Sequence, residues 1–208
     1  MLVSKNLTFS YDNSKVFHFP NITLGKREHL LVLGESGIGK TTMIQLLAGL
    51  LTAHSGELLI NGTDITKLNS TQLDLYRGKH IGMVFQKPYF VRNFSVLENL
   101  LLSLYLSKNK KDEKKALHLL DQIGLADKKN HQPNQLSQGE QQRMSIALAV
   151  LKNPDLILAD EPTSSLDDTN CYKIAQLLEE QAQSTNAQLI IITHDSRLKT
   201  HFNKSITL

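Results

Sequence analysis

The stretch HLLVLGESGIGKTTMIQLLAGLL, residues 29–51, decides how the rest of the chain is interpreted. An apolar run leads into a glycine-rich segment, and a helix-forming segment follows at once. This pattern predicts a buried strand, a loop, and a helix from about Lys40 to Leu50. A strand–loop–helix unit of this kind is typical of α/β proteins with a mostly parallel sheet.

The loop GESGIGKT, Gly34–Thr41, matches the phosphate-loop pattern G-x-x-x-x-G-K-[ST] in the strand-to-helix context that supports it. Backbone N–H groups of such a loop wrap phosphates, Lys40 would reach the β and γ oxygens, and the Thr41 hydroxyl would ligate Mg²⁺. The residues that we expect to bind the nucleotide here are Gly34, Glu35, Ser36, Gly37, Ile38, Gly39, Lys40, Thr41 and Thr42.

The chain has 208 residues, of which 40% are hydrophobic and 21% charged, as in a globular domain. Its net charge of +3 gives no electrostatic reason to expect nucleic acid. The single cysteine, Cys171, fits a reducing compartment, and no apolar run approaches the ~20 residues that span a bilayer. The N-terminus lacks the apolar block of a signal peptide, so we expect a cytoplasmic protein.

Further elements extend on both sides of the phosphate loop. A turn is expected at YDNSK, residues 11–15, and the Asn61–Gly62 dipeptide predicts another turn that ends a strand. Apolar residues are spaced as in helices from Ser95 to Ile123, and another helix begins at LSQGEQQR and ends at Asn153–Pro154. The other predicted elements are strands Leu2–Phe9, Val16–Phe19, Ile22–Leu24, Ile81–Phe85, Leu156–Ala159, Gln188–Thr193 and Ser205–Leu208, with a helix from about Asp167 to Ala182. We interpret residues 1–208 as a single domain, in which a helical subdomain of about 89–152 is inserted between core segments 1–88 and 153–208.

The segment LILADE ends a buried strand with two adjacent carboxylates. Asp160 at the strand end could hold Mg²⁺ through water, and Glu161 could polarise an attacking water. The alternative is that Asp-Glu-Pro only caps a strand before a turn, and this alternative is weakened by the phosphate loop upstream.

The segment LSQGEQQR, Leu136–Arg143, has the form of a helix start, with Ser and Gly before an amphipathic run. Free N–H groups and the helix dipole make such a start a binding site for anions. A chain with a phosphate loop would then carry a second phosphate-facing helix end.

Five motifs together resemble the ATPase subunits of ABC transporters: the phosphate loop, VFQ with Gln86, LSQGEQQR, ADEPTSSLD and IITHD. They occur in that family's order and spacing, and the resemblance covers essentially the whole chain. It implies the ABC ATPase fold, with a P-loop NTPase core, an antiparallel N-terminal β part and the inserted helical subdomain. It also implies ATP hydrolysis.

The resemblance implies a head-to-tail dimer, either a homodimer or a heterodimer. Each ATP would lie on the phosphate loop of one subunit and under the LSQGE helix of the other. Ser137 and Gly139 would therefore face the γ-phosphate of a partner's ATP, and one chain could not complete its own site.

The resemblance also implies roles for four further residues, by their positions in the chain. Tyr11 matches the aromatic residue that stacks on adenine, although a surface tyrosine beside a turn is the simpler alternative. Gln86 matches the glutamine that contacts Mg²⁺ and the attacking water. His194 matches the histidine that contacts the γ-phosphate. Asp167 matches the loop that touches the opposite subunit, although a helix N-cap alone would also explain it.

Two residues depart from the commonest family pattern. Gln138 stands where glycine is usual, and a glutamine is disfavoured if the backbone there needs a positive φ. Glu140 suits the first helical turn but would sit poorly if it pointed at phosphate, so we expect it to turn away.

Two surface segments suggest partners. The segment KPYFVRNFSV after Gln86 places Tyr89, Phe90 and Phe94 where the family receives a cytoplasmic helix of an integral-membrane permease, although core packing is an equal alternative for each aromatic residue. We therefore expect docking near Gln86–Phe94, with the chain peripheral on the inner membrane through the permease. The basic run KNKKDEKK could touch acidic lipids, but a solvated helix face explains it more simply.

Within the family, LSQGEQQR and LADEPTSSLD look closest to the lipoprotein-releasing and macrolide-export group, which also includes a cell-division ATPase. Two other functions stay open: a soluble ABC-type ATPase that acts on DNA or ribosomes, and a nucleotide-gated scaffold in a cell-division complex. The first would be expected to carry long insertions or tandem domains, and the second would not need Glu161 and His194.

Overall fold

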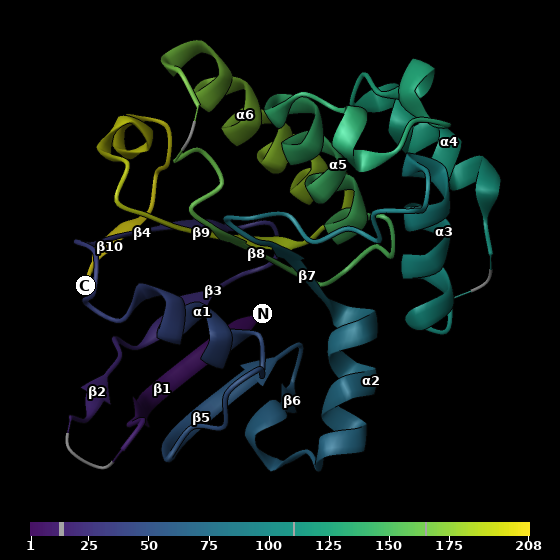
Figure 1. The fold of residues 1–208 in the computed structure, drawn as a ribbon. Coiled ribbons are helices and arrows are strands. Elements are labelled where there is room, and N and C mark those ends of the chain that lie inside the picture. The colour runs from purple at the N-terminus through teal and green to yellow at the C-terminus, as the bar shows by residue number, and fades with distance from the viewer. Residues whose placement is uncertain (13–14, 110, 165) are drawn as a thin grey trace.

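The structure is a computed structural model that describes residues 1–12, 15–109, 111–164 and 166–208. Its centre is a parallel sheet with strand order β10-β4-β9-β8-β7 (Figure 1). These strands are β4 (His29–Leu33), β7 (Ile81–Val84), β8 (Leu156–Asp160), β9 (Gln188–Thr193) and β10 (Ser205–Thr207). The predicted α/β fold with a mostly parallel sheet is confirmed.

An antiparallel sheet forms a second layer from the N-terminal part of the chain. It contains β1 (Leu2–Phe9), β2 (Phe17–His18), β3 (Ile22–Leu24), β5 (Ser55–Ile60) and β6 (Thr63–Asp64). Asn61 and Gly62 both have positive φ, 48° and 81°, and join β5 to β6 as the predicted tight turn. The turn predicted at residues 11–15 includes residues 13 and 14, which lie outside the described residues.

Alternate residues of the parallel strands enter two hydrophobic clusters, one on each face. On one face, Leu31, Ile157 and Ile191 pack with helices α3 (Val96–Leu106), α4 (Glu113–Gln122), α5 (Gln138–Val150) and α6 (Asp168–Thr185). On the other face, Leu30, Leu158 and Ile190 pack with α1 (Lys40–Leu47) and the antiparallel sheet (Figure 1). A sheet buried on both faces explains why its strands are apolar throughout.

The chain also forms a helix that the sequence analysis did not predict, α2 (Ser70–His80). None of its described residues is fully buried, so it lacks the apolar stripe by which helices are usually predicted. Its start is a capping box in which Asn69 and Gln72 bond each other's backbone N–H groups. The Tyr76 hydroxyl donates to the Ile60 carbonyl at 2.8 Å and ties the helix to β5.

Several helix ends differ from the predicted ones because residues with positive φ stop them. α1 ends at Leu47 rather than Leu50, just before Gly49 with φ 64°, and α6 continues to Thr185 before Asn186 with φ 57°. The short 3₁₀ helices are η1 (Ile65–Lys67), η2 (Ala126–Lys128), η3 (Pro133–Gln135) and η4 (Ser196–Thr200). In the part of the chain that the structure describes, no helix has the length and apolar character needed to cross a membrane.

Candidate functional site

The predicted site residues gather at one edge of the parallel sheet. The phosphate loop follows β4, Gln86 follows β7, Asp160 ends β8 and His194 follows β9. Because all these strands are parallel, their carboxyl ends meet at the same edge, where ligands of α/β proteins commonly bind.

The phosphate loop takes a backbone shape that needs glycine. Gly37 and Gly39 have φ of 85° and 110°, and a Cβ on Gly39 would lie 2.9 Å from the Phe17 ring. Lys40 is only 7% exposed, and its Nζ donates to the carbonyls of Gly34 and Glu35 at 2.7 and 2.9 Å. The lysine ammonium is therefore held over the loop, where phosphate oxygens would come.

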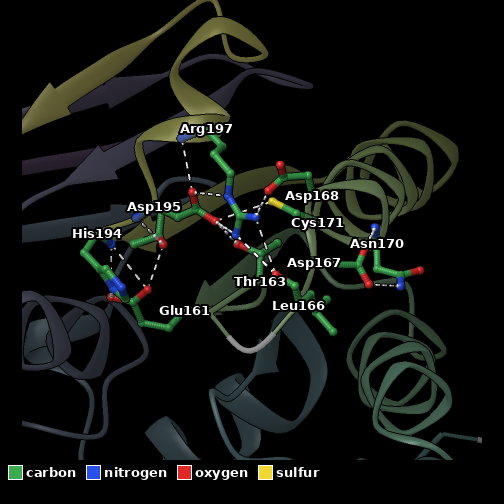
Figure 2. Close-up of polar contacts among 11 residues, drawn as sticks. Glu161, Thr163, Leu166, Asp167, Asp168, Asn170, Cys171, His194, Asp195 and Arg197 are labelled. Carbon is green, nitrogen blue, oxygen red and sulfur yellow. Dashed lines mark hydrogen bonds and ion pairs between the residues drawn. The ribbon is translucent and has the colours of Figure 1, made fainter.

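The Glu161 carboxylate has several polar contacts at this edge. Its side chain accepts from the Thr193 hydroxyl at 2.7 Å and the His194 backbone N–H at 3.1 Å, and His194 Nδ1 lies 2.9 Å from Oε1 (Figure 2). Lys40 Nζ lies 3.6 Å from the same oxygen. Glu161 also has a positive φ of 48°, a conformation that is strained for a side chain of this size. This strain is opposed by the hydrogen bond from its N–H to Ile192, at 2.8 Å.

Asp160, next to Glu161 in the chain, has a carboxyl group with a raised pKa. Burial raises its pKa to about 6, the neighbouring Glu161 charge adds to the rise, and Lys40 opposes it. Its Oδ1 is buried and has no hydrogen-bond partner among the described residues. A buried carboxylate oxygen without a partner is costly unless a cation or a proton occupies it.

Gln86 and Glu161 line a small pocket together with Ser164, Leu166 and the side chain of Gln138. Tyr11 lies at the other side of the phosphate loop, where its hydroxyl is 3.0 Å from Thr42 Oγ1 and its ring packs edge-on against Phe9. The Tyr11 side chain is 64% exposed, so most of the ring is open to a ligand.

The start of α5 differs from the phosphate loop in its chemistry. Ser137 caps the helix, and Glu140 turns back so that its carboxylate accepts from the Ser137 N–H at 2.7 Å. This bond lowers the pKa of Glu140 and holds its carboxylate against the backbone of its own helix start. Gln138 has no positive φ because it is the first residue of the helix, so its substitution for glycine is free of that strain. A Cβ on Gly139 would meet only Arg143 Nη1, at 3.8 Å.

Asp167 caps α6 by accepting from the Asn170 backbone N–H at 2.9 Å, so the capping alternative is observed. The Asp167 side chain is exposed. Ser165, two residues before it, lies outside the described residues.

The sequence analysis missed a polar cluster behind the site. Asp195 and Arg197 form an ion pair, and Thr163 and Cys171 also donate to Asp195, at 3.1 and 3.4 Å (Figure 2). Cys171 is fully buried and also belongs to this cluster. The sequence signal was the polar run HDSR directly after a buried strand, of which only His194 was singled out.

A separate groove of about 650 Å³ is lined by residues of α2, β7, α3 and α5. Its apolar lining includes Phe85, Tyr89, Phe90, Val91, Leu102 and Leu106. Tyr89 is 74% exposed, whereas Phe90 also packs against the core, and Phe94 belongs to a neighbouring pocket with Tyr105. Lys152 at the groove donates to the Arg77 carbonyl at 3.2 Å, and burial lowers the pKa of this lysine to about 8.

Comparisons with known proteins agree with this geometry. The family model described as ABC transporter matches residues 17–164. The lipoprotein-releasing system ATP-binding protein LolD of Treponema denticola is 38% identical over 92% of this chain and 86% of its own length. LolD of Bacteroides fragilis is 32% identical over 99% of this chain and 96% of its own length.

Solved structures are similar over the whole chain. The dimeric structure of a post-hydrolysis state of the ATP-binding cassette MJ0796, bound to ADP and Pi, has a TM-score of 0.88 and 32% identity, and the match covers 100% of this chain and 94% of that one. The cbiO1 protein of Clostridium perfringens, part of the ABC transporter complex cbiONQ, has a TM-score of 0.87 and 25% identity, with 99% and 83% covered.

Proposed function

This chain belongs to the ABC transporter family, and from that membership we propose that it works as half of an ATP-sandwiched dimer in which each site is built from two chains. It is an ATP-binding and ATP-hydrolysing subunit that powers a separate membrane permease. The two LolD relatives are named for lipoprotein release, and we propose that this chain drives a complex of the same class.

The contact series Lys40–Glu161–His194 carries the proposal for hydrolysis. Glu161 would orient and polarise the attacking water as general base, and Lys40 would hold the β and γ oxygens. His194 uses Nδ1 for Glu161, and its second ring nitrogen can serve the γ-phosphate, since the side chain is 54% exposed. Gln86, in the same pocket as Glu161, would contact the water from the other side.

Tyr11 would complete the nucleotide site on its base side. Its exposed ring is held next to α1 by the hydroxyl contact with Thr42, which places it beside the phosphate loop. An aromatic face in this position would stack on adenine.

The oxygen donors at the sheet edge fit Mg²⁺. We propose that Asp160, the Thr41 hydroxyl and the Gln86 amide oxygen hold it, because Asp160 Oδ1 is buried without a partner and all three donors are hard oxygen ligands. No cluster of His, Cys, Asp or Glu in the described ranges could hold a metal alone, which suits an ion that keeps water and phosphate ligands. When bound, Mg²⁺ would neutralise charge on the β and γ oxygens.

The open space around Gly139 supports the two-chain site. Glycine is not required there by this chain's own packing, because an added Cβ meets nothing closer than 3.8 Å. We propose that the close approach of a phosphate on the partner's nucleotide requires it, with Ser137 as a second contact and Asp167 touching the partner. The similar MJ0796 cassette is described as dimeric.

The groove beside α3 is the surface that we propose for the permease. Its apolar lining and its size suit the face of one amphipathic helix, and Tyr89 and Val91 lie in the predicted docking segment. Docking there would hold the chain at the membrane.

The test of the hydrolytic assignment is Glu161→Gln. We expect the variant to bind ATP and form an ATP-dependent dimer on size-exclusion chromatography, while turnover falls about 10²–10⁴-fold. Glu57→Gln, on an exposed position of β5, is the matched control and should leave turnover unchanged. Normal turnover in Glu161→Gln would contradict the general-base role.

A further inference from the structure

One guanidinium joins two segments that the proposed mechanism treats separately. Arg197, in η4, donates from Nε to Asp195 Oδ1 at 2.8 Å and from a terminal nitrogen to Oδ2 at 2.6 Å. It also donates to the Leu166 carbonyl, at 3.4 and 3.5 Å, and forms an ion pair with Asp168 (Figure 2). The side chain thus spans the loop after β9 and the turn before α6.

On the first side, Asp195 is connected to Glu161 through the Thr193 hydroxyl. The Asp195 backbone N–H donates to Thr193 Oγ1 at 3.0 Å, and this hydroxyl donates to Glu161 at 2.7 Å. The Asp195 side chain is only 9% exposed and accepts from Thr163 and Cys171 as well. Its carboxylate is therefore a fixed point, and Arg197 keeps the pKa of that carboxyl near 2.

On the second side, Arg197 holds a wall of the hydrolytic pocket. Leu166 lines the small pocket that also contains Glu161 and Gln86. Asp167, next in the chain, caps α6 through Asn170 and has no part in the arginine contacts described above. The Leu166–Asp167 turn is thus attached to the loop after β9 through Arg197.

We propose that Arg197 is a positioning residue for ATP hydrolysis, which fixes the Leu166–Asp167 turn relative to Glu161 and His194. The inference rests on the proposed two-chain site, because that turn is the part of this pocket wall expected to meet the partner subunit. Arg197 acts in this proposal only through its contacts with Asp195, Asp168 and the Leu166 carbonyl.

The fork shape of the guanidinium explains why arginine is needed. Its N–H groups reach a carboxylate in a bidentate pair, a backbone carbonyl and a second carboxylate at the same time. A lysine at this position could neutralise Asp195, but as a point charge it could not bridge to the Leu166 carbonyl and Asp168. Arg197→Lys therefore separates charge neutralisation from bridging.

The experiment compares Arg197→Lys in two backgrounds. In the otherwise native chain, we expect kcat for ATP to fall about tenfold with KM unchanged, because a turn that is loosely held misplaces reacting groups rather than nucleotide. In the Glu161→Gln background, ATP-dependent dimerisation should weaken, while binding of a fluorescent ATP analogue to the isolated subunit should not change. Asp168→Asn removes one anchor at an exposed position and should show a smaller loss of kcat in the same direction.

Arg27→Lys is the matched control, because Arg27 also uses its guanidinium for a side-chain contact, with Asn186 at 2.6 Å, away from the site. The inference is overturned if Arg197→Lys keeps wild-type kcat and dimerisation, or if its losses follow lowered melting temperature and lowered ATP binding together. If Glu161→Gln alone fails to dimerise with ATP, the two-chain proposal falls and this inference falls with it. If Glu161→Gln dimerises with ATP and Arg197→Lys changes neither kcat nor dimerisation, this inference is rejected and the two-chain proposal stands.

Discussion

The phosphate loop and the start of α5 both carry glycines expected to lie near phosphate, but the glycines are required for different reasons. Gly39 is required by the chain itself, since its φ is 110° and a Cβ would press on Phe17. Gly139 has helical backbone and open space around it. The fold of this chain therefore requires Gly39 but not Gly139, and this difference is the reason for the proposal that a partner's phosphate approaches Gly139.

The strongest way to break this comparison is Gly139→Leu. The side chain would occupy the open space without disturbing the fold, so we expect ATP turnover to fall about 100-fold while thermal stability and ATP binding to the isolated subunit stay unchanged. Turnover by a coupled phosphate assay and melting by calorimetry measure the two effects. Wild-type turnover in this variant would show that Gly139 meets no phosphate.

Mixing two inactive variants tests whether each ATP site is built from two chains. Lys40→Ala damages the phosphate loop and Gly139→Leu damages the helix start, so their heterodimer contains one site with both defects and one intact site. Each variant alone should be inactive, and an equal mixture should recover up to about a quarter of wild-type turnover for statistical pairing. If a single chain held its whole site, mixing two inactive chains would restore nothing.

Alanine substitution at Gly39 and at Gly139 is expected to have a smaller effect, which is on the free energy of unfolding. Gly39→Ala places a Cβ at a left-handed φ and should lower the free energy of unfolding by up to about 3 kcal/mol. Gly139→Ala lies in the first turn of α5 and should instead raise it, by about 0.5 kcal/mol. Urea denaturation measures both, and equal destabilisation by the two substitutions would remove the distinction between the regions.

The last expected effect is on acid sensitivity, where the change is confined to a narrow range of low pH. The pKa of Asp195 is lowered to about 2, chiefly by its hydrogen bonds with Arg197, so its contribution is fully present above the unfolded pKa near 4 and is lost as the pH falls toward 2. That contribution is on the order of 2 kcal/mol. Asp195→Asn should flatten the fall in unfolding free energy between about pH 4 and pH 2.

The start of α5 supplies the control for that measurement. The pKa of Glu140 is also lowered, through its bond with the Ser137 N–H, but this carboxylate is more exposed. Glu140→Gln retains the capping geometry and should change the acid slope less than Asp195→Asn. A larger change for Glu140→Gln would mean that charge matters more at the helix start than at the sheet edge.

Local patterns were sufficient for much of the fold and for the recognition of the family. The phosphate loop, the Asn61–Gly62 turn and strand β9 could each be predicted from neighbouring residues, and all three appear as predicted. Helix α2 was missed because its apolar residues make no stripe, although its Asn69–Gln72 capping box was readable. Site roles rest on the family resemblance and stay predictions until variants are measured.

Tertiary contacts account for what could not be predicted. Nothing in the sequence indicates that Arg197 would reach the Leu166 carbonyl, since the two are far apart in the chain and meet only when β9 lies next to β8. The left-handed backbone of Glu161 likewise depends on its bond to Ile192 on the neighbouring strand.

The last strand has a practical consequence for anyone who labels this protein. β10 pairs with β4, the Leu208 N–H donates to Leu33 at 2.8 Å, and a Cβ added to Gly34 would lie 3.4 Å from Leu208. A dye attached at position 208 would therefore lie beside the phosphate loop and would report nucleotide arrival.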